Sequence, residues 1–100
     1  MPADIATLTA ADFEPHVRDE FQIASPTGKI AVSLKLVEVH RLGRAVRPDG
    51  AFSLLFLSPP GPIYPQGTYP LTHATLGTLD LFLVPLGPND SGNRYEAVFT

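Results

Sequence analysis

Beyond residue 20, apolar residues alternate with polar ones along most of the chain, which is the pattern of half-buried β-strands. Residues 20–24 alternate briefly and run into a Ser-Pro-Thr-Gly sequence that is typical of a turn. Residues 29–40 alternate over a longer stretch, but the apolar positions shift by one residue between Leu36 and Val37. Such a shift predicts a β-bulge, or a strand that passes from one sheet to another.

The second half of the chain contains further strand patterns. Residues 51–57 are apolar on both faces, which predicts a central strand covered on two sides. Residues 78–86 and 94–100 alternate again, and the turn-rich residues 87–93 between them predict a hairpin. The side chains that these patterns turn inward include Leu34, Phe56, Leu81 and Phe99.

Two segments interrupt the strands. Residues 41–50 combine glycine, proline and arginine, and they predict a loop. Residues 59–70 hold five prolines, which excludes a central strand. Pro70 is compatible with an edge position or an early position in an extended segment over residues 68–73.

A short helix is expected before the first strand. Thr9 is a favourable N-cap, and Asp12 stands three residues later, where a carboxylate stabilises the start of a helix. Leu8 and Phe13 have the spacing of a hydrophobic staple, and Pro15 limits the helix to one or two turns. Together with six to seven strands, this helix predicts a mainly-β fold: a small antiparallel β-barrel or sandwich, with Leu8 and Phe13 plugging one end.

The composition agrees with one globular domain over residues 1–100 and removes several classes of function. The chain has 44% hydrophobic and 17% charged residues and a net charge of −3, which disfavours nucleic acid and anionic membranes as partners. It has no cysteine, which excludes disulfides, thiolate metal sites and thiol catalysis. The first residues lack a secretory-signal pattern, and no apolar run approaches the roughly 20 residues of a membrane helix. We therefore expect a soluble, cytoplasmic protein.

The residues with catalytic potential are better explained as structural. His73 lies between a predicted strand end and a turn; it could act as a base or metal ligand, but a hydrogen bond that orders the turn is favoured. His16 and His40 lack the spacing of a metal site. Asp80 and Glu96 could lie near each other across the final hairpin, but their apolar neighbours place them on the outer, solvated face. The sequence therefore assigns no catalytic, cofactor-binding or metal-binding residue.

Two segments are candidate partner-binding surfaces. Arg41, Arg44 and Arg47 form a local positive patch that could pair with an acidic protein partner. Tyr64 and Tyr69 lie on the proline-stiffened segment and could contact a partner as well. For each segment we favour the structural alternative, a solvated hairpin tip for the arginines and a rigid lid over one end of the core for the tyrosines.

Five segments, taken in order, resemble a family of small bacterial proteins that is defined as a domain of unknown function. These segments are LTAADFEPHV, LKLVEV, FSLLF, PQGTYPLTHATLGTLDLFLVP and RYEAVF, and they span residues 8–99. The resemblance implies no catalytic residue and an association with phage-tail-like genes. It also leads us to expect glycine where this chain has Arg18, which puts the geometry of the turn after the helix in question.

The leading hypothesis is a non-enzymatic binding or assembly module whose partner is another protein or a second copy of the chain. The alternative is a small-ligand-binding protein or enzyme with its site in a barrel mouth, which would hold at least two of His40, Tyr64, Tyr69 and His73. A third hypothesis is an accessory of a phage-tail-like apparatus.

Overall fold

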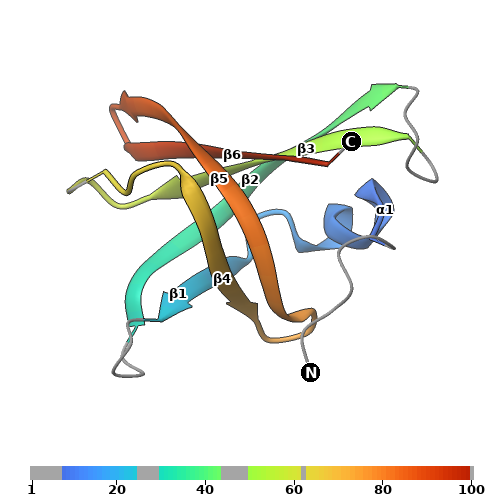
Figure 1. The fold of residues 1–100 in the computed structure, drawn as a ribbon, viewed down its shortest axis with the longest axis horizontal. Helices are drawn as coiled ribbons and strands as arrows, with labels where there is room; N and C mark the ends of the chain where they lie inside the picture. The colour runs from blue at the N-terminus through green and yellow to red at the C-terminus, as the bar shows by residue number, and fades with distance from the viewer. Residues whose placement is uncertain (1–7, 25–29, 44–49, 62, 100) are drawn as a thin grey trace.

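The computed structural model describes residues 8–24, 30–43, 50–61 and 63–99 (Figure 1). In chain order the elements are α1 (Ala10–Phe13), η1 (Glu14–His16), β1 (Glu20–Ala24), β2 (Ile30–Gly43), β3 (Ala51–Ser58), β4 (Gly67–His73), β5 (Gly77–Asn89) and β6 (Gly92–Phe99). The prediction of a mainly-β fold with one short helix is confirmed. Within these residues, no helix is both long enough and apolar enough to span a membrane.

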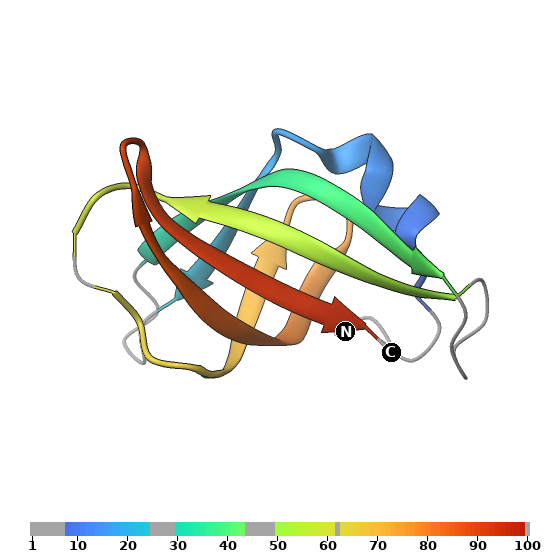
Figure 2. The ribbon, with the colours of Figure 1, turned by 90° about the horizontal axis from the view of Figure 1, so that it is seen from above.

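The strands form one antiparallel sheet that closes on itself in the order β1–β2–β3–β6–β5–β4, so the structure is a small barrel (Figures 1 and 2). Two long strands serve two neighbours each: β2 pairs with β1 and then β3, and β5 pairs with β4 and then β6. The ring closes between β1 and β4 through two residue pairs, Gln22–Thr72 and Ile23–Leu71. Pro70 comes one residue before Leu71 and is not paired with β1. On that side it therefore has the edge position expected from its missing N–H.

The shift in the hydrophobic pattern of β2 is a β-bulge, as predicted. Leu36 pairs with Phe56 of β3, whereas the next pair joins Glu38 to Leu55, so Val37 is the extra residue. The bulge falls close to the point where β2 leaves β1 and continues along β3. Because a bulge bends and twists a strand, it lets β2 take part in both halves of the barrel.

Inward-facing apolar side chains from all six described strands fill the barrel. Leu34, Phe56, Leu81 and Phe99 are at most 5% exposed, so the predicted alternation is confirmed at these positions. Burying one such side chain stabilises a fold by about 1.5–3 kcal/mol. The interior is therefore the main source of stability.

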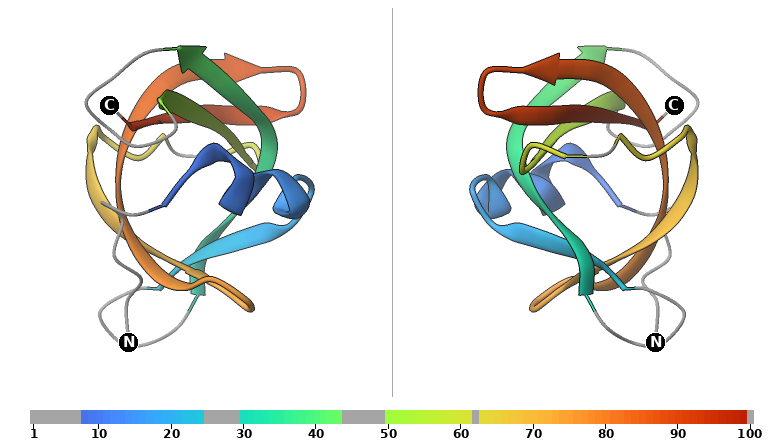
Figure 3. Two further views of the ribbon diagram at one scale, coloured as in Figure 1. Left: turned by 90° about the vertical axis from the view of Figure 1, so that its right-hand side faces the viewer. Right: turned by 90° about the vertical axis from the view of Figure 1, so that its left-hand side faces the viewer.

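The helix covers one end of the barrel (Figure 3). Phe13 is fully buried, and its ring centroid lies 5.8 Å from that of Phe52 and 5.7 Å from that of Phe99. The Asp12 carboxylate accepts a hydrogen bond from the Thr9 N–H at 2.8 Å, which fixes the start of α1. Both the helix and its role as a plug were predicted.

The segment between β3 and β4 lies at the opposite end (Figures 1 and 3). The Tyr64 N–H donates a hydrogen bond of 2.8 Å to the hydroxyl of Tyr95, a buried residue of β6. Asn93 Nδ2 donates to the Gly61 carbonyl at 3.0 Å. These bonds attach the segment to the start of β6, as expected of a lid.

Two predicted loop boundaries are wrong. β2 continues to Gly43, so residues 41–43 belong to a strand and not to a loop. β5 and β6 extend through most of residues 87–93 and leave a short turn between Asn89 and Gly92. In both places the residues pair with a neighbouring strand, and these ladder hydrogen bonds outweigh a local glycine and proline content that favours loops.

The expected proximity of Asp80 and Glu96 is also wrong. The register places Glu96 opposite Val84 on β5, whereas Asp80 lies opposite Pro70 on β4. Asp80 therefore lies in the part of β5 that pairs with β4, whereas Glu96 lies on β6 beside a later part of β5. Asp80 is exposed and Glu96 is half-buried, and neither belongs to the core.

Candidate functional site

His73 is the one histidine of the chain that is buried. It ends β4 and is 5% exposed, and its Nε2 lies 2.9 Å from Asp19 Oδ2. Its Nδ1 accepts hydrogen bonds from the N–H groups of Thr75, at 3.0 Å, and Leu76, at 3.1 Å. A ring nitrogen that accepts two N–H bonds carries no proton, so the proton of His73 is on Nε2 and is donated to Asp19. The prediction that His73 orders the turn is confirmed, and both of its nitrogens are occupied.

Asp19 joins His73 to a second histidine. Its Oδ2 also lies 3.0 Å from Nδ1 of His16, and the two imidazole rings meet edge to face at 4.5 Å. Hydrogen bonds from His73 first and His16 second hold the pKa of the Asp19 carboxyl below its ordinary value of 3.8, because they favour the charged form. Partial desolvation acts in the opposite direction and is the weaker influence.

The three residues of this histidine–aspartate cluster are of types that bind metal ions, but the hydrogen bonds of His73 do not leave a nitrogen free to act as a ligand. The three candidate ligand atoms of His16, Asp19 and His73 lie within 4.8 Å of one another. A metal at Nε2 of His73 would have to displace the proton there, while the two backbone donors prevent the proton from moving to Nδ1. The ring would become an imidazolate. The residues therefore do not fit a metal ion, and the cluster fastens the turn after η1 to the end of β4.

The predicted arginine patch is only partly described. Arg41 lies in β2 and forms a two-pronged ion pair with Glu14, with Nη2–Oε1 at 2.9 Å and Nε–Oε2 at 3.2 Å. Arg44 and Arg47 lie outside the described residues. Arg41 therefore connects η1 to β2 in this structure. This ion pair accounts for the position of Arg41 within the chain itself, with no need to invoke a second protein.

The two predicted tyrosines lie together at the other end of the barrel. The ring centroids of Tyr64 and Tyr69 are 5.9 Å apart, and both side chains pack partly against the core. The Tyr69 hydroxyl donates to the Pro65 carbonyl at 2.6 Å. The C-terminal end of β2 lies on the opposite side of the molecule (Figure 1), so Arg41 and the tyrosines do not form one surface.

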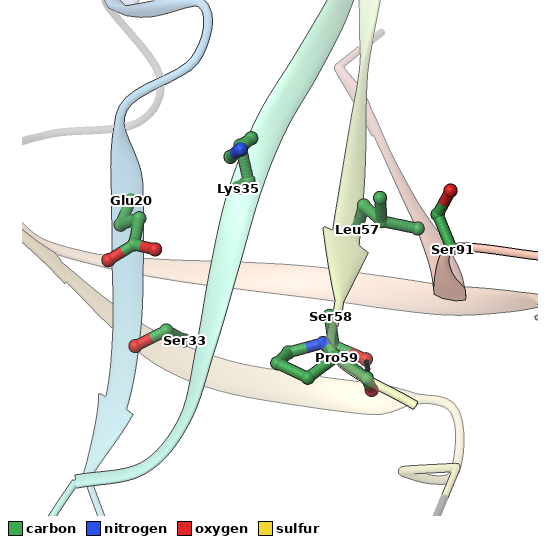
Figure 4. A pocket seen from close by; sticks show the side chains of 7 residues that line it. All are labelled: Glu20, Ser33, Lys35, Leu57, Ser58, Pro59 and Ser91. Carbon is green, nitrogen blue, oxygen red and sulfur yellow. Dashed lines mark hydrogen bonds between the residues drawn. The ribbon is translucent and has the colours of Figure 1, made fainter. Parts of the chain in front are cut away.

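A small pocket, which the sequence did not indicate, lies where β2 and β3 diverge (Figure 4). Its volume is about 220 Å³, and its lining residues are Glu20, Ser33, Lys35, Leu57, Ser58, Pro59 and Ser91. None of the four residues predicted for a barrel-mouth site lines it. His40 instead lies on the surface, with Nε2 2.8 Å from Glu38 Oε2. The only signal in the sequence was the outward alternation of Ser33 and Lys35, which surface strands share generally.

Comparison with known proteins identifies a family. Residues 8–99 match the family described as "Domain of unknown function (DUF6916)". The chain belongs to this family. The resemblance carried by the five sequence segments is thereby confirmed. Neither the curated proteins nor the solved structures gave a significant match.

Position 18 of this DUF6916 chain has the geometry that favours glycine, although the residue is arginine. Arg18 has φ +83°, and it is the one non-glycine residue with a positive φ in the described part of the chain. Its N–H donates to the Leu36 carbonyl at 2.6 Å, and the Leu36 N–H donates to the Asp19 carbonyl at 3.0 Å. These bonds to β2 hold the turn in place despite the side chain.

Proposed function

We propose that this DUF6916 chain is a non-enzymatic protein-binding or assembly module that acts through the outer surface of its barrel. The observation that carries this proposal is the apolar interior. The buried side chains are mostly apolar or aromatic, and the buried polar residues in the described part of the chain are Ser53, Ser58, His73 and Asn93. The one buried histidine uses both ring nitrogens to hold a turn.

The ends of the barrel support the same conclusion. Phe13 fills one end, and the segment anchored by Tyr64 and Asn93 lies over the other. A ligand in a barrel mouth would have to displace one of these segments. Binding to the outer surface requires no such rearrangement.

The outer surface also carries apolar side chains. The large hydrophobic residues that are exposed among the described residues are Leu42, Ile63, Phe82, Leu86 and Val98. Phe82 and Val98 are 50% and 49% exposed, and they pair with Thr68 of β4 and Ser53 of β3. Single exposed hydrophobic residues are common on protein surfaces, and these add apolar contact area for a partner.

Affinity capture followed by reconstitution tests the proposal. The full chain would be immobilised, incubated with an extract of its source cells, and any retained protein purified and mixed with the chain again. We expect a defined complex by light scattering, formed either with that protein or with a second copy of the chain. A chain that remains monomeric and forms no complex with any purified candidate would overturn the proposal.

The pocket at Lys35 favours a second candidate, a small-ligand-binding protein. Its carboxylate, ammonium and hydroxyl groups suit a small zwitterion, although its volume of about 220 Å³ is below the roughly 300–1,000 Å³ of most ligand sites. Titration with free amino acids, followed by NMR, should then shift the amide signals of Ser33 and Ser58. Unchanged signals at millimolar ligand would exclude this candidate for that ligand class.

The phage-tail role stays a separate proposal, to be tested by deleting the gene and counting assembled particles.

A further inference from the structure

Two rows of side chains cross the outer face of β2, β3, β6 and β5, three of which run side by side in Figure 2 (β2, β3 and β6). Residues that pair across antiparallel strands project from the same face of the sheet. The first row consists of Lys35, Leu57, Arg94 and Gly87. The second row consists of Glu38, Leu55, Glu96 and Val84. Leu36, Phe56 and Tyr95 pair between the rows and are buried, so both rows face outward.

The two rows carry opposite charges on β2 and on β6, and they are uncharged on β3 and β5. The first row is basic on β2 and β6, through Lys35 and Arg94, and the second is acidic on the same strands, through Glu38 and Glu96. On β3, between them, Leu57 and Leu55 are partly exposed. A separation of two strand residues places the rows roughly 7 Å apart. Glu20 lies opposite Lys35 in the β1–β2 pairing, but β1 is outside this four-strand face. Among the described residues, neither Glu20 nor Lys35 forms an ion pair.

We propose that this face binds a second copy of the chain across a two-fold axis that runs parallel to the rows and between them. Rotation about that axis places each strand over its own counterpart and exchanges the rows. Lys35 then faces Glu38 of the second copy, and Arg94 faces Glu96 of the second copy. Leu57 faces Leu55 of the second copy, and every contact occurs twice.

The charge pattern selects this axis and this partner. An axis parallel to the strands would place the basic row of one copy over the basic row of the other, and like charges in contact oppose association. A uniformly acidic partner would be repelled by Glu38 and Glu96, and a uniformly basic one by Lys35 and Arg94. A second copy in the stated orientation is complementary to both rows.

The size of the face predicts weak association. The closed barrel curves across these four strands, so the contact centres on β3 and its neighbours β2 and β6 and lies well below the roughly 800 Å² per partner of a standard interface. We expect a dimer that forms between about 10 μM and 1 mM and weakens as salt is added. The inference rests on the proposed function, because it names the partner of the outer surface.

A charge swap at two exposed positions tests the orientation. The variant Lys35→Glu places two acidic groups opposite each other at each β2 contact, and Glu38→Lys places two basic groups there. By sedimentation over the stated concentrations, each variant alone should be monomeric. An equal mixture of the two should recover wild-type association, because opposite charges again face each other.

Asp80→Lys is the matched control. It changes the net charge as Glu38→Lys does, from an exposed site outside both rows. Asp80→Lys keeps both rows, so it should self-associate as the wild type does. Fluorescently labelled Lys35→Glu should stay monomeric in its presence, because position 35 would still face Glu38. A wild-type chain that is monomeric at about 1 mM, a charge-swap mixture that does not associate, or equal association of labelled Lys35→Glu with Asp80→Lys and with Glu38→Lys would overturn the inference.

Disulfide trapping gives an independent test, since the chain has no cysteine of its own. Variants Leu55→Cys and Leu57→Cys would be mixed under mild oxidation, after their melting curves confirm folding. The disulfide between positions 55 and 57 of different copies should form at least several-fold faster than either like-with-like disulfide. Equal rates would contradict the axis. If either variant fails to fold, Lys35→Cys and Glu38→Cys supply the same comparison at exposed positions.

Failure of this inference and failure of the proposed function are distinguishable. A monomeric chain that forms a defined complex with another purified protein would overturn the self-association and leave the proposed function in place. A monomeric chain that forms no complex would overturn both.

Discussion

Arg18 occupies a backbone conformation that glycine adopts at a lower energy. Its φ of +83° brings Cβ close to the backbone, which costs a non-glycine residue roughly 1–2 kcal/mol. Two backbone hydrogen bonds with Leu36 hold the turn in this geometry. The adjacent Asp19 belongs to the cluster with His16 and His73. Local strain and a partly buried polar contact therefore lie side by side at this turn.

Arg18→Gly is expected to stabilise the protein by up to about 1 kcal/mol, because relief of strain outweighs the greater freedom of glycine in the unfolded chain. For a domain of this size, 1 kcal/mol raises Tm by about 4–8 °C. Thermal unfolding followed by circular dichroism measures the shift. Arg18→Ala removes the same guanidinium and keeps Cβ, so it should give no comparable gain. A lower Tm for Arg18→Gly would contradict the strain argument.

The lowered pKa of the Asp19 carboxyl predicts that the protein loses stability in acid. Its pKa is lower in the folded state, so its contribution is fully present above the unfolded value, near 3.8, and is lost as pH falls through the still lower folded value. Urea unfolding from pH 6 to pH 2.5 should therefore show a steeper decline in the free energy of unfolding below pH 4 for wild type than for Asp19→Asn. Parallel curves would show that the cluster makes no contribution through this carboxyl.

At the scale of elements, the two long strands β2 and β5 determine the shape. Each pairs with one neighbour through its first part and with another through its second part. Each is also irregular: β2 has its bulge at Val37, and the pairing of β5 with β6 shifts between Pro85 and Gly87. These irregularities let one strand follow two directions, and so a chain of this length can close a barrel.

Gly92 is expected to be indispensable to the β5–β6 hairpin. Its φ is +147°, and a Cβ at this position would overlap the Ser58 carbonyl oxygen. Gly87 is the matched control, because its φ is +96° but nothing lies within 4 Å of its Cβ position. Gly87→Ala should cost about 1–2 kcal/mol through strain alone, whereas Gly92→Ala should cost clearly more or prevent folding. Chemical denaturation measures the two losses in the free energy of unfolding. Equal losses would show that the backbone at Ser58 can move away from the added Cβ at little cost.

At the scale of the whole molecule, the candidate surfaces are separate. The end of β2 that precedes the arginine-rich residues lies opposite the segment that bears the tyrosines (Figure 1). The two charged rows lie on the outer face of the barrel between them. A partner that uses one of these surfaces need not obstruct the others.

Arg44→Glu tests the arginine patch against the charged rows. The sequence predicts a solvated loop at position 44, and substitutions in such loops usually change stability by less than about 0.5 kcal/mol, so Tm should hardly move. If the patch binds an acidic partner, affinity for that partner, measured by titration calorimetry, should fall. Self-association should persist, because position 44 follows the end of β2 and belongs to neither row. Loss of self-association in this variant would show that the interface extends to the patch.

Local patterns in the sequence were enough to predict which side chains enter the core and where the helix begins. Period-two alternation identified Leu34, Phe56 and Leu81, and the Thr9–Asp12 spacing identified the cap, because both signals are local. These patterns did not predict the ring closure, the proximity of His16, Asp19 and His73, or the alignment of the charged rows. These features depend on the register between strands that are distant in the sequence. A hydrophobic pattern specifies which face of a strand is buried, but it does not specify which residue lies opposite which.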